Sequence, residues 1–251
     1  MRRRSTAAVA AVLLASVLPT TEARAGVFDE FQIFDGRIAE PGGFDLNQHL
    51  VFGRRGRAGD GAPRNGMLLT SEIGYATTAW HEIALYLPVA REFSGDVFGG
   101  GFKVRNTFVV PHAGERPVAG GFDIELRHQS YRFSSADWAV TLRPIFDLRT
   151  GPWQAIFNLN VEVPIGRGGP VFAPAVRGVY QVAERAWLGL EHFMEFGRFD
   201  RWETARRQAH QLFVTTDFKI GEKTGLHFGL GHGLTRNSDR WAGKVILSLD
   251  F

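Results

Sequence analysis

The C-terminal stretch Trp241-Ala-Gly-Lys-Val-Ile-Leu-Ser-Leu-Asp-Phe251 alternates between apolar and mostly polar side chains. Successive side chains of a β-strand point to opposite faces, so this pattern predicts a strand with one apolar face and one polar face. The length fits a tilted strand that crosses a membrane, for which about 9–11 residues are needed. Trp241 and Phe251 stand at the two ends of the apolar face, where a membrane strand places its interfacial aromatic residues.

The same alternation recurs along the chain and predicts twelve antiparallel strands. They span residues 44–52, 67–75, 81–89, 98–110, 122–131, 138–149, 153–163, 172–182, 188–196, 211–220, 226–234 and 241–251. Connectors after odd-numbered strands are mostly long and charged, and those after even-numbered strands are mostly short, as in transmembrane barrels with short periplasmic turns. The sequence therefore predicts an all-β, antiparallel transmembrane β-barrel of about 12 strands over residues 44–251. A soluble β-sandwich is the alternative.

The N-terminal residues 1–25 have the three parts of a secretory signal peptide. These are the basic start Met1–Arg4, the apolar run Ala7–Leu18 and a small-x-small cleavage site at Ala23–Ala25. We expect export and cleavage, followed by an irregular segment on the periplasmic side over residues 26–43. The chain has no cysteine, which excludes disulfides, lipoprotein attachment and thiolate metal sites.

The net charge of +3 comes from the predicted signal peptide, which holds four arginines and one glutamate. The rest of the chain is neutral, which removes the main argument for nucleic-acid binding. Mean hydropathy is −0.11 and no run of about twenty apolar residues is present, so membrane-spanning helices are excluded. A barrel has such a neutral average because only half of each strand needs to be apolar.

Two resemblances extend this interpretation. A last strand that alternates in this way and ends in Phe251 resembles the assembly signal of bacterial outer-membrane β-barrels, which implies the barrel-assembly machinery as a partner. Four motifs resemble an uncharacterised proteobacterial family of exported outer-membrane β-barrel proteins, similar in kind to transporter-like barrels of the phenol-degradation type. The motifs are PGGFDLNQH (41–49), WHEIALYLP (80–88), HQLF (210–213) and GLTRNSDRW (233–241). This family resemblance implies no substrate and no catalytic residue.

The polar strand faces carry both signs of charge and would line the barrel interior. The lumen-lining candidates are Lys103, Arg105, Asp123, Glu125, Arg127, Arg143, Arg177, Glu191, Glu195, Asp217 and Lys244. Unpaired charges are costly in a low-dielectric interior, so a network of ion pairs that closes the bore is favoured over a narrow polar pore. Gly229, Gly231 and Gly233 leave one wall bare, which would widen the bore or admit a long side chain or the N-terminal segment.

Two groups of residues were candidates for chemistry. Asp45, Asn47 and His49 share a strand face, but a metal site there would need ligands from a neighbouring strand. His128 and Ser130 lie on the lipid-side face, where polar residues are costly. This pair resembles the base and nucleophile of outer-membrane phospholipases and lipid A deacylases.

The hydrolase pattern is incomplete in this sequence. On the next predicted strand, the matching face offers Trp138, Val140 and Leu142 in place of a polar residue that would orient the histidine. Tyr131 and Arg132 replace the Asn-Gly that follows the phospholipase serine. We therefore predict no catalytic residue, no metal and no cofactor.

The leading functional hypothesis is a passive channel or transporter for small polar or hydrophobic solutes. It would lie in the bacterial outer membrane in contact with outer-membrane lipids, without a nucleic-acid partner. A lipid hydrolase that uses His128 and Ser130 and a closed structural barrel are the alternatives. The sequence does not identify the solute.

Deletion of Phe251 tests the predicted role of the last strand. We expect the truncated protein to reach the outer membrane at a much lower level, because this strand closes the barrel and an open strand edge is untenable in lipid. The measurement is the amount of folded barrel in outer-membrane fractions. Deletion of Glu222 from a predicted short turn is the control, and equal levels of both variants would contradict the prediction.

Overall fold

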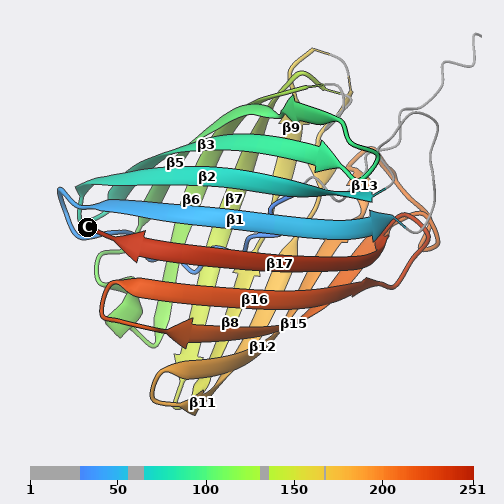
Figure 1. The fold of residues 1–251 in the computed structure, drawn as a ribbon. Helices are drawn as coiled ribbons and strands as arrows, with labels where there is room; N and C mark the ends of the chain where they lie inside the picture. The colour runs from blue at the N-terminus through green and yellow to red at the C-terminus, as the bar shows by residue number, and fades with distance from the viewer. Residues whose placement is uncertain (1–28, 56–64, 131–135, 167) are drawn as a thin grey trace, which may run out of the picture.

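The computed structural model describes residues 29–55, 65–130, 136–166 and 168–251, which form a closed antiparallel β-barrel (Figure 1). Its elements are β1 (Phe44–Arg55), β2 (Asn65–Thr78), β3 (His81–Glu92), β4 (Val97–Gly99), β5 (Gly101–Val109), η1 (Ala113–Glu115), β6 (Val118–Gln129), β7 (Trp138–Thr150), β8 (Trp153–Asn158), β9 (Val161–Pro164), β10 (Val171–Phe172), β11 (Ala175–Ala183), β12 (Ala186–Glu195), β13 (Gly197–Arg198), β14 (Arg201–Trp202), β15 (Ala209–Lys219), β16 (Thr224–Gly233) and β17 (Asp239–Asp250).

Short fragments continue longer strands, so the barrel wall is crossed twelve times, as predicted. β4 and β5 both pair with β3, and β8 and β9 both pair with β7. β10, β13 and β14 extend β11, β12 and β15 in the same way. Two of the breaks lie at Gly101 and Gly197, whose φ angles of 98° and 95° are readily accessible only to glycine.

The barrel closes between its first and last strands. β1 pairs with β2 on one side and with β17 on the other, from Asp45 opposite Asp250 to Arg54 opposite Trp241. Phe251 continues this seam, since its backbone N–H donates to the carbonyl of Phe44 at 2.8 Å. No free strand edge therefore remains at this seam.

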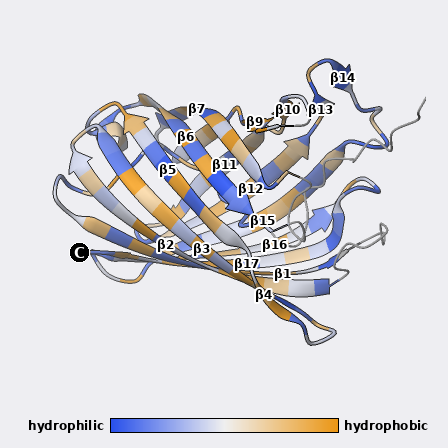
Figure 2. Cartoon of the chain, turned by 90° about the horizontal axis from the view of Figure 1, so that it is seen from above, coloured by the Kyte–Doolittle hydropathy of each residue, from blue (hydrophilic) through white to orange (hydrophobic). Residues whose placement is uncertain are grey.

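The exterior of the barrel is apolar and its interior is polar, which is the reverse of a soluble domain. On β12, Leu190 is 56% exposed whereas its neighbour Glu191 is only 1% exposed. Alternating hydrophobic and hydrophilic residues are visible along β5, β6 and β7 (Figure 2). This arrangement confirms the predicted barrel and overturns the sandwich alternative. Within the described ranges, no helix is long and apolar enough to cross a membrane.

The described residues that precede β1 lie mostly inside the barrel. Residues 29–43, here called the N-terminal segment, contain no helix or strand. The end of the barrel that carries the short turns and the C-terminus is here called the turn end, and the opposite end the loop end (Figure 1). The segment runs from Phe31, which packs against Val51 and Ala242 well inside the wall, to Gly42 and Gly43 beside Ala76 at the turn end. We expected this segment on the periplasmic side, but the structure places most of its described part in the lumen. Residues 26–28 and the predicted signal peptide lie outside the described residues.

A bulky side chain covers the bare wall of β16. Gly231 pairs directly with Phe213 of β15, and a Cβ atom at Gly231 would lie 2.6 Å from the Phe213 ring. At Gly229, an added Cβ would lie 2.9 Å from the Lys244 side chain. The glycines therefore make room for long interior side chains rather than leaving a wider bore at this wall.

Replacement of Gly231 by alanine tests this packing. We expect Gly231→Ala to lower the free energy of unfolding by about 1–3 kcal/mol, because the methyl group overpacks the interior against Phe213. Unfolding in urea, followed by tryptophan fluorescence of the lipid-reconstituted barrel, provides the measurement. Gly178→Ala on β11 is the control, since its added Cβ meets no atom within 4 Å. Equal stabilities of the two variants would show that the interior at Gly231 is loosely packed.

Candidate functional site

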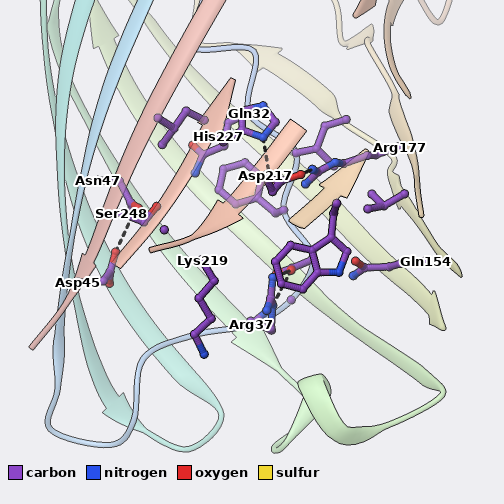
Figure 3. Close-up of a pocket in the computed structure, with 18 of the residues that line it drawn as sticks. Gln32, Arg37, Asp45, Asn47, Gln154, Arg177, Asp217, Lys219, His227 and Ser248 are labelled. Carbon is purple, nitrogen blue, oxygen red and sulfur yellow. Dashed lines mark hydrogen bonds and ion pairs between the residues drawn. The ribbon is translucent and has the colours of Figure 1, made fainter. Parts of the chain in front are cut away.

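The candidate site is a cavity of about 670 Å³ in the turn-end half of the barrel. Its lining combines the N-terminal segment with residues near the turn ends of the strands. In Figure 3, Arg37 of the segment and Lys219 and Gln154 of the wall surround it, and Arg177 and Asp217 point toward one another. The cavity thus presents charged and amide groups of both the wall and the segment.

Toward the loop end from this cavity, an apolar cluster fills part of the lumen. Phe31 of the N-terminal segment is 3% exposed and packs against the rings of Phe193 and Phe213, with ring centroids 5.2 and 5.0 Å away. The remaining members of this Phe31 cluster are Val51, Leu68, Ala90, Ala242 and Phe98. None of the cluster residues lines the cavity. The Phe31 cluster is therefore a constriction above the cavity.

One ion-pair network joins β2, β3 and β5 inside the barrel. The Arg105 guanidinium lies 3.0 Å from Glu72 and 2.9 Å from Glu82. Tyr86 donates a hydrogen bond to Glu72 at 2.7 Å, and His49 of β1 lies 2.8 Å from the same carboxylate. All these side chains are at most 5% exposed, so each charge is compensated in place, as burial requires.

A second network joins β11, β12, β15, β16 and β17. Glu191 contacts the Lys244 ammonium, and its other oxygen lies 3.1 Å from Arg177. Arg177 also pairs with Asp217, which lies 2.8 Å from His227. This network and the cavity share residues, so the cavity wall carries charge that is already paired.

Further wall charges are paired in a similar way. Arg143 of β7 pairs with Asp123 of β6 at 2.8 Å, and Arg127 pairs with Glu162 of β9. Lys103 of β5 pairs with Glu30 of the N-terminal segment at 2.5 Å. The segment is therefore part of the charge compensation of the wall.

Main-chain and ring contacts hold the middle of the N-terminal segment. The amide of Asn158 accepts from the backbone N–H of Phe34 and donates to its carbonyl, both at 2.8 Å. The Phe34 ring lies under two guanidinium groups, 4.6 Å from Arg105 and 4.2 Å from Arg143, as in cation–π pairs. Lys244 donates to the carbonyl of Phe31 at 2.5 Å. The contacts of the segment thus reach strands on all sides of the barrel.

At the lower end of the segment, Arg37 pairs with Asp35 at 2.5 Å beside the cavity. Burial raises the pKa of Asp35, but the attraction of the Arg37 guanidinium, the hydrogen bonds that Arg37 donates and the charge of Arg149 together outweigh burial, so the pKa lies below its ordinary value. Asp35 is therefore a carboxylate at neutral pH, and the two residues form a charged pair at the cavity wall.

The structure places the residues predicted to line the lumen on interior strand faces. Glu125 is 6% exposed and lies 3.8 Å from Arg143, and Glu195 follows Phe193 by two residues on the same strand face. Lys103, Arg105, Asp123, Arg127, Arg143, Arg177, Glu191, Asp217 and Lys244 are joined by the ion pairs described above. Whether any of them lines a conducting path stays a prediction.

Several interior residues were missed as site residues. Glu72, Glu82 and Tyr86 stood on the polar faces of predicted strands, and that position was a usable signal for their burial. Phe31 and Phe34 carried no such signal, because the segment that contains them has no periodic pattern.

The groups considered for chemistry are held in structural contacts. Asn47 donates to Asp45 at 2.8 Å while His49 pairs with Glu72, so the three side chains do not converge. Across the described residues, no three His, Cys, Asp or Glu side chains are placed to hold a metal ion. The ring of His128 donates to the main-chain carbonyl of Asp137 at 3.0 Å and stacks on Trp138.

Comparison with known proteins identifies the fold. No protein-family model and no curated protein matches the chain. Among solved structures, the COG4313 outer membrane channel from Pseudomonas putida F1 is similar, with a TM-score of 0.60 over 88% of this chain and 99% of that one at 14% identity. The fold is that of an outer-membrane channel. The KdgM porin, solved in complex with disordered oligogalacturonate, has a TM-score of 0.52 over 83% of this chain and 98% of that one at 9% identity.

Replacement of Lys244 tests how much the buried Lys244–Glu191 pair stabilises the barrel. We expect Lys244→Met to lower the free energy of unfolding by about 3–5 kcal/mol, because it leaves Glu191 undercompensated and the carbonyl of Phe31 without its donor. Lys223→Met in the exposed β15–β16 turn is the control, with an expected change within about 0.5 kcal/mol. Urea unfolding of both reconstituted variants gives the comparison, and similar values would mean that the buried pair adds little.

Proposed function

We propose that the protein is a channel of the bacterial outer membrane that passes small polar or hydrophobic solutes when its N-terminal segment leaves the lumen. The observation that carries this proposal is the combination of a charged cavity at one end of a channel-type barrel with a constriction whose central ring, Phe31, belongs to the N-terminal segment. Displacement of that segment would join the cavity to the loop end.

The way in which the segment is held supports reversible displacement. It forms no strand and is held in the lumen by side-chain pairs, two cation–π contacts and individual hydrogen bonds. A barrel of twelve strands is wider than an eight-stranded one, whose own side chains fill the interior, and narrower than the large porins. The space vacated by the segment would therefore be a narrow passage with paired charges on its wall.

The proposed location in the outer membrane rests on three supports. The outward strand faces are mainly apolar, the fold is that of outer-membrane channels, and residues 1–25 have the pattern of a secretory signal. The short turns and the C-terminus lie at one end of the barrel (Figure 1), which would be the periplasmic end.

A closed structural barrel is the second candidate function. The buried ion pairs favour it, because charged side chains from many strands compensate one another and the segment fills the space between them. A hydrolase has less support, since the described partners of His128 are a main-chain carbonyl and aromatic rings rather than a carboxylate.

Single-channel recording separates the channel from the closed barrel. We expect small or infrequent conductance steps from the wild-type protein and severalfold larger steps after deletion of residues 29–38, because the deletion removes the Phe31 cluster's central ring and the Phe34 contacts. Phe31→Ala should increase the frequency of opening without a deletion.

Phe93→Ala is the matched control, because Phe93 is an exposed aromatic residue in a loop-end connector. Heat-modifiable gel mobility confirms that each inserted variant is folded. A folded deletion variant that stays electrically silent would overturn the channel and leave the closed barrel.

A further inference from the structure

Three histidines lie on the outer face of the barrel wall, where apolar side chains are the norm. Leu212 of β15 pairs directly with His192 of β12 on one side and with His232 of β16 on the other. His210 precedes Leu212 by two residues and so shares its outward face. Polar groups within the apolar part of a membrane are costly, so this group is expected at headgroup level. Trp241, next to His232 with ring centroids 4.7 Å apart, is an aromatic residue typical of that level.

Two of the outward histidines, His192 and His210, are hydrogen-bonded to each other. The Nδ1 atom of His210 lies 3.1 Å from Nε2 of His192, and its Nε2 lies 3.1 Å from the side-chain oxygen of Gln208. His192 and His210 are both half-buried. The group is thus an ordered polar patch on the barrel exterior.

Two loop-end connectors are joined directly beyond this patch. The side chain of Asn237, between β16 and β17, donates to the carbonyl of Arg207, between β14 and β15. Ser238 accepts from the backbone N–H of His210 at 2.7 Å and donates to its carbonyl at 2.8 Å. These bonds fix residues 203–208 and 234–238 against each other and against the histidine patch.

Exposed arginines lie in the joined connectors and at the start of β17. Arg206, Arg207, Arg236 and Arg240 are exposed, and none of them forms an ion pair with a carboxylate among the described residues. Arg198, by contrast, is paired with Asp200 at 2.5 Å. Exposed Phe199 and Trp202 lie in the same stretch of chain and mark it as interfacial. Positive charge therefore collects above the histidine patch on one side of the barrel.

We propose that this surface, the rim formed by the guanidinium groups of Arg206, Arg207, Arg236 and Arg240 with the polar patch of His192, His210 and His232 below them, binds the sugar-linked phosphates of a lipid A-type glycolipid in the outer leaflet. The proposal rests on the outer-membrane location proposed above. Guanidinium groups pair with phosphate through two parallel hydrogen bonds, and fixed loops lower the entropy cost of placing several of them around one ligand. The acyl chains of such a lipid would lie along the apolar wall below, which includes Leu190, Leu212 and Leu230.

Native mass spectrometry of the full chain in detergent, titrated with bisphosphorylated lipid A, tests this inference. We expect the wild-type protein to retain a defined lipid A adduct that the variant Arg207→Gln/Arg236→Gln binds about tenfold more weakly, since charge-assisted hydrogen bonds are lost. The matched control is Arg185→Gln/Lys223→Gln, which removes two exposed positive charges from turns at the opposite end of the barrel. The control should bind like the wild type.

Enzymatically dephosphorylated lipid A provides the second arm and should bind the wild-type protein about tenfold more weakly. Equal loss in both double variants, or equal binding of the phosphorylated and dephosphorylated lipids, would overturn the proposal. Phosphatidylglycerol that binds the rim as tightly as lipid A would also overturn it, by showing a general anion surface. The conductance of the same preparations reports on the channel separately, so failure of lipid binding does not depend on failure of the proposed function.

Discussion

The hydrogen bonding between β1 and β17 is the constraint on which the rest of the structure depends. Within lipid, an unpaired backbone N–H or carbonyl costs several kcal/mol, so a sheet can cross a membrane only when it has no edge. Closure directs alternate side chains outward to lipid and inward to the lumen. The contrast between Leu190 and Glu191 on one strand follows directly from this requirement.

Closure with twelve strands also leaves a wide interior that must be filled and whose charges must be paired. The circumference leaves a bore that wall side chains alone do not fill, and the wall carries charges that cannot remain unpaired away from water. Cross-strand pairs such as Arg143–Asp123 satisfy part of this charge. The N-terminal segment satisfies more of it through Glu30, and it also brings the apolar rings of Phe31 and Phe34 into the lumen.

The sequence was most informative where period-two alternation operates. The alternation predicted the closed twelve-stranded barrel and the inward direction of residues such as Lys244 and Asp217, because lipid outside and polar groups inside act on every strand. Partners across the lumen could not be predicted, since they depend on register and barrel curvature between residues far apart in sequence, as for Lys244 and Glu191. The path of residues 29–43 could not be predicted either, because an irregular segment has no sequence pattern that distinguishes a place in the lumen from one in the periplasm.

The contacts of the N-terminal segment have a consequence for cooperativity. In a bare ring of strands, each strand interacts mainly with its two neighbours. The segment connects strands that are not neighbours, since Asn158 of β8, Lys103 of β5 and Lys244 of β17 all bind it. It therefore couples strands that do not touch one another, so that disrupting the segment weakens several distant parts of the wall at once.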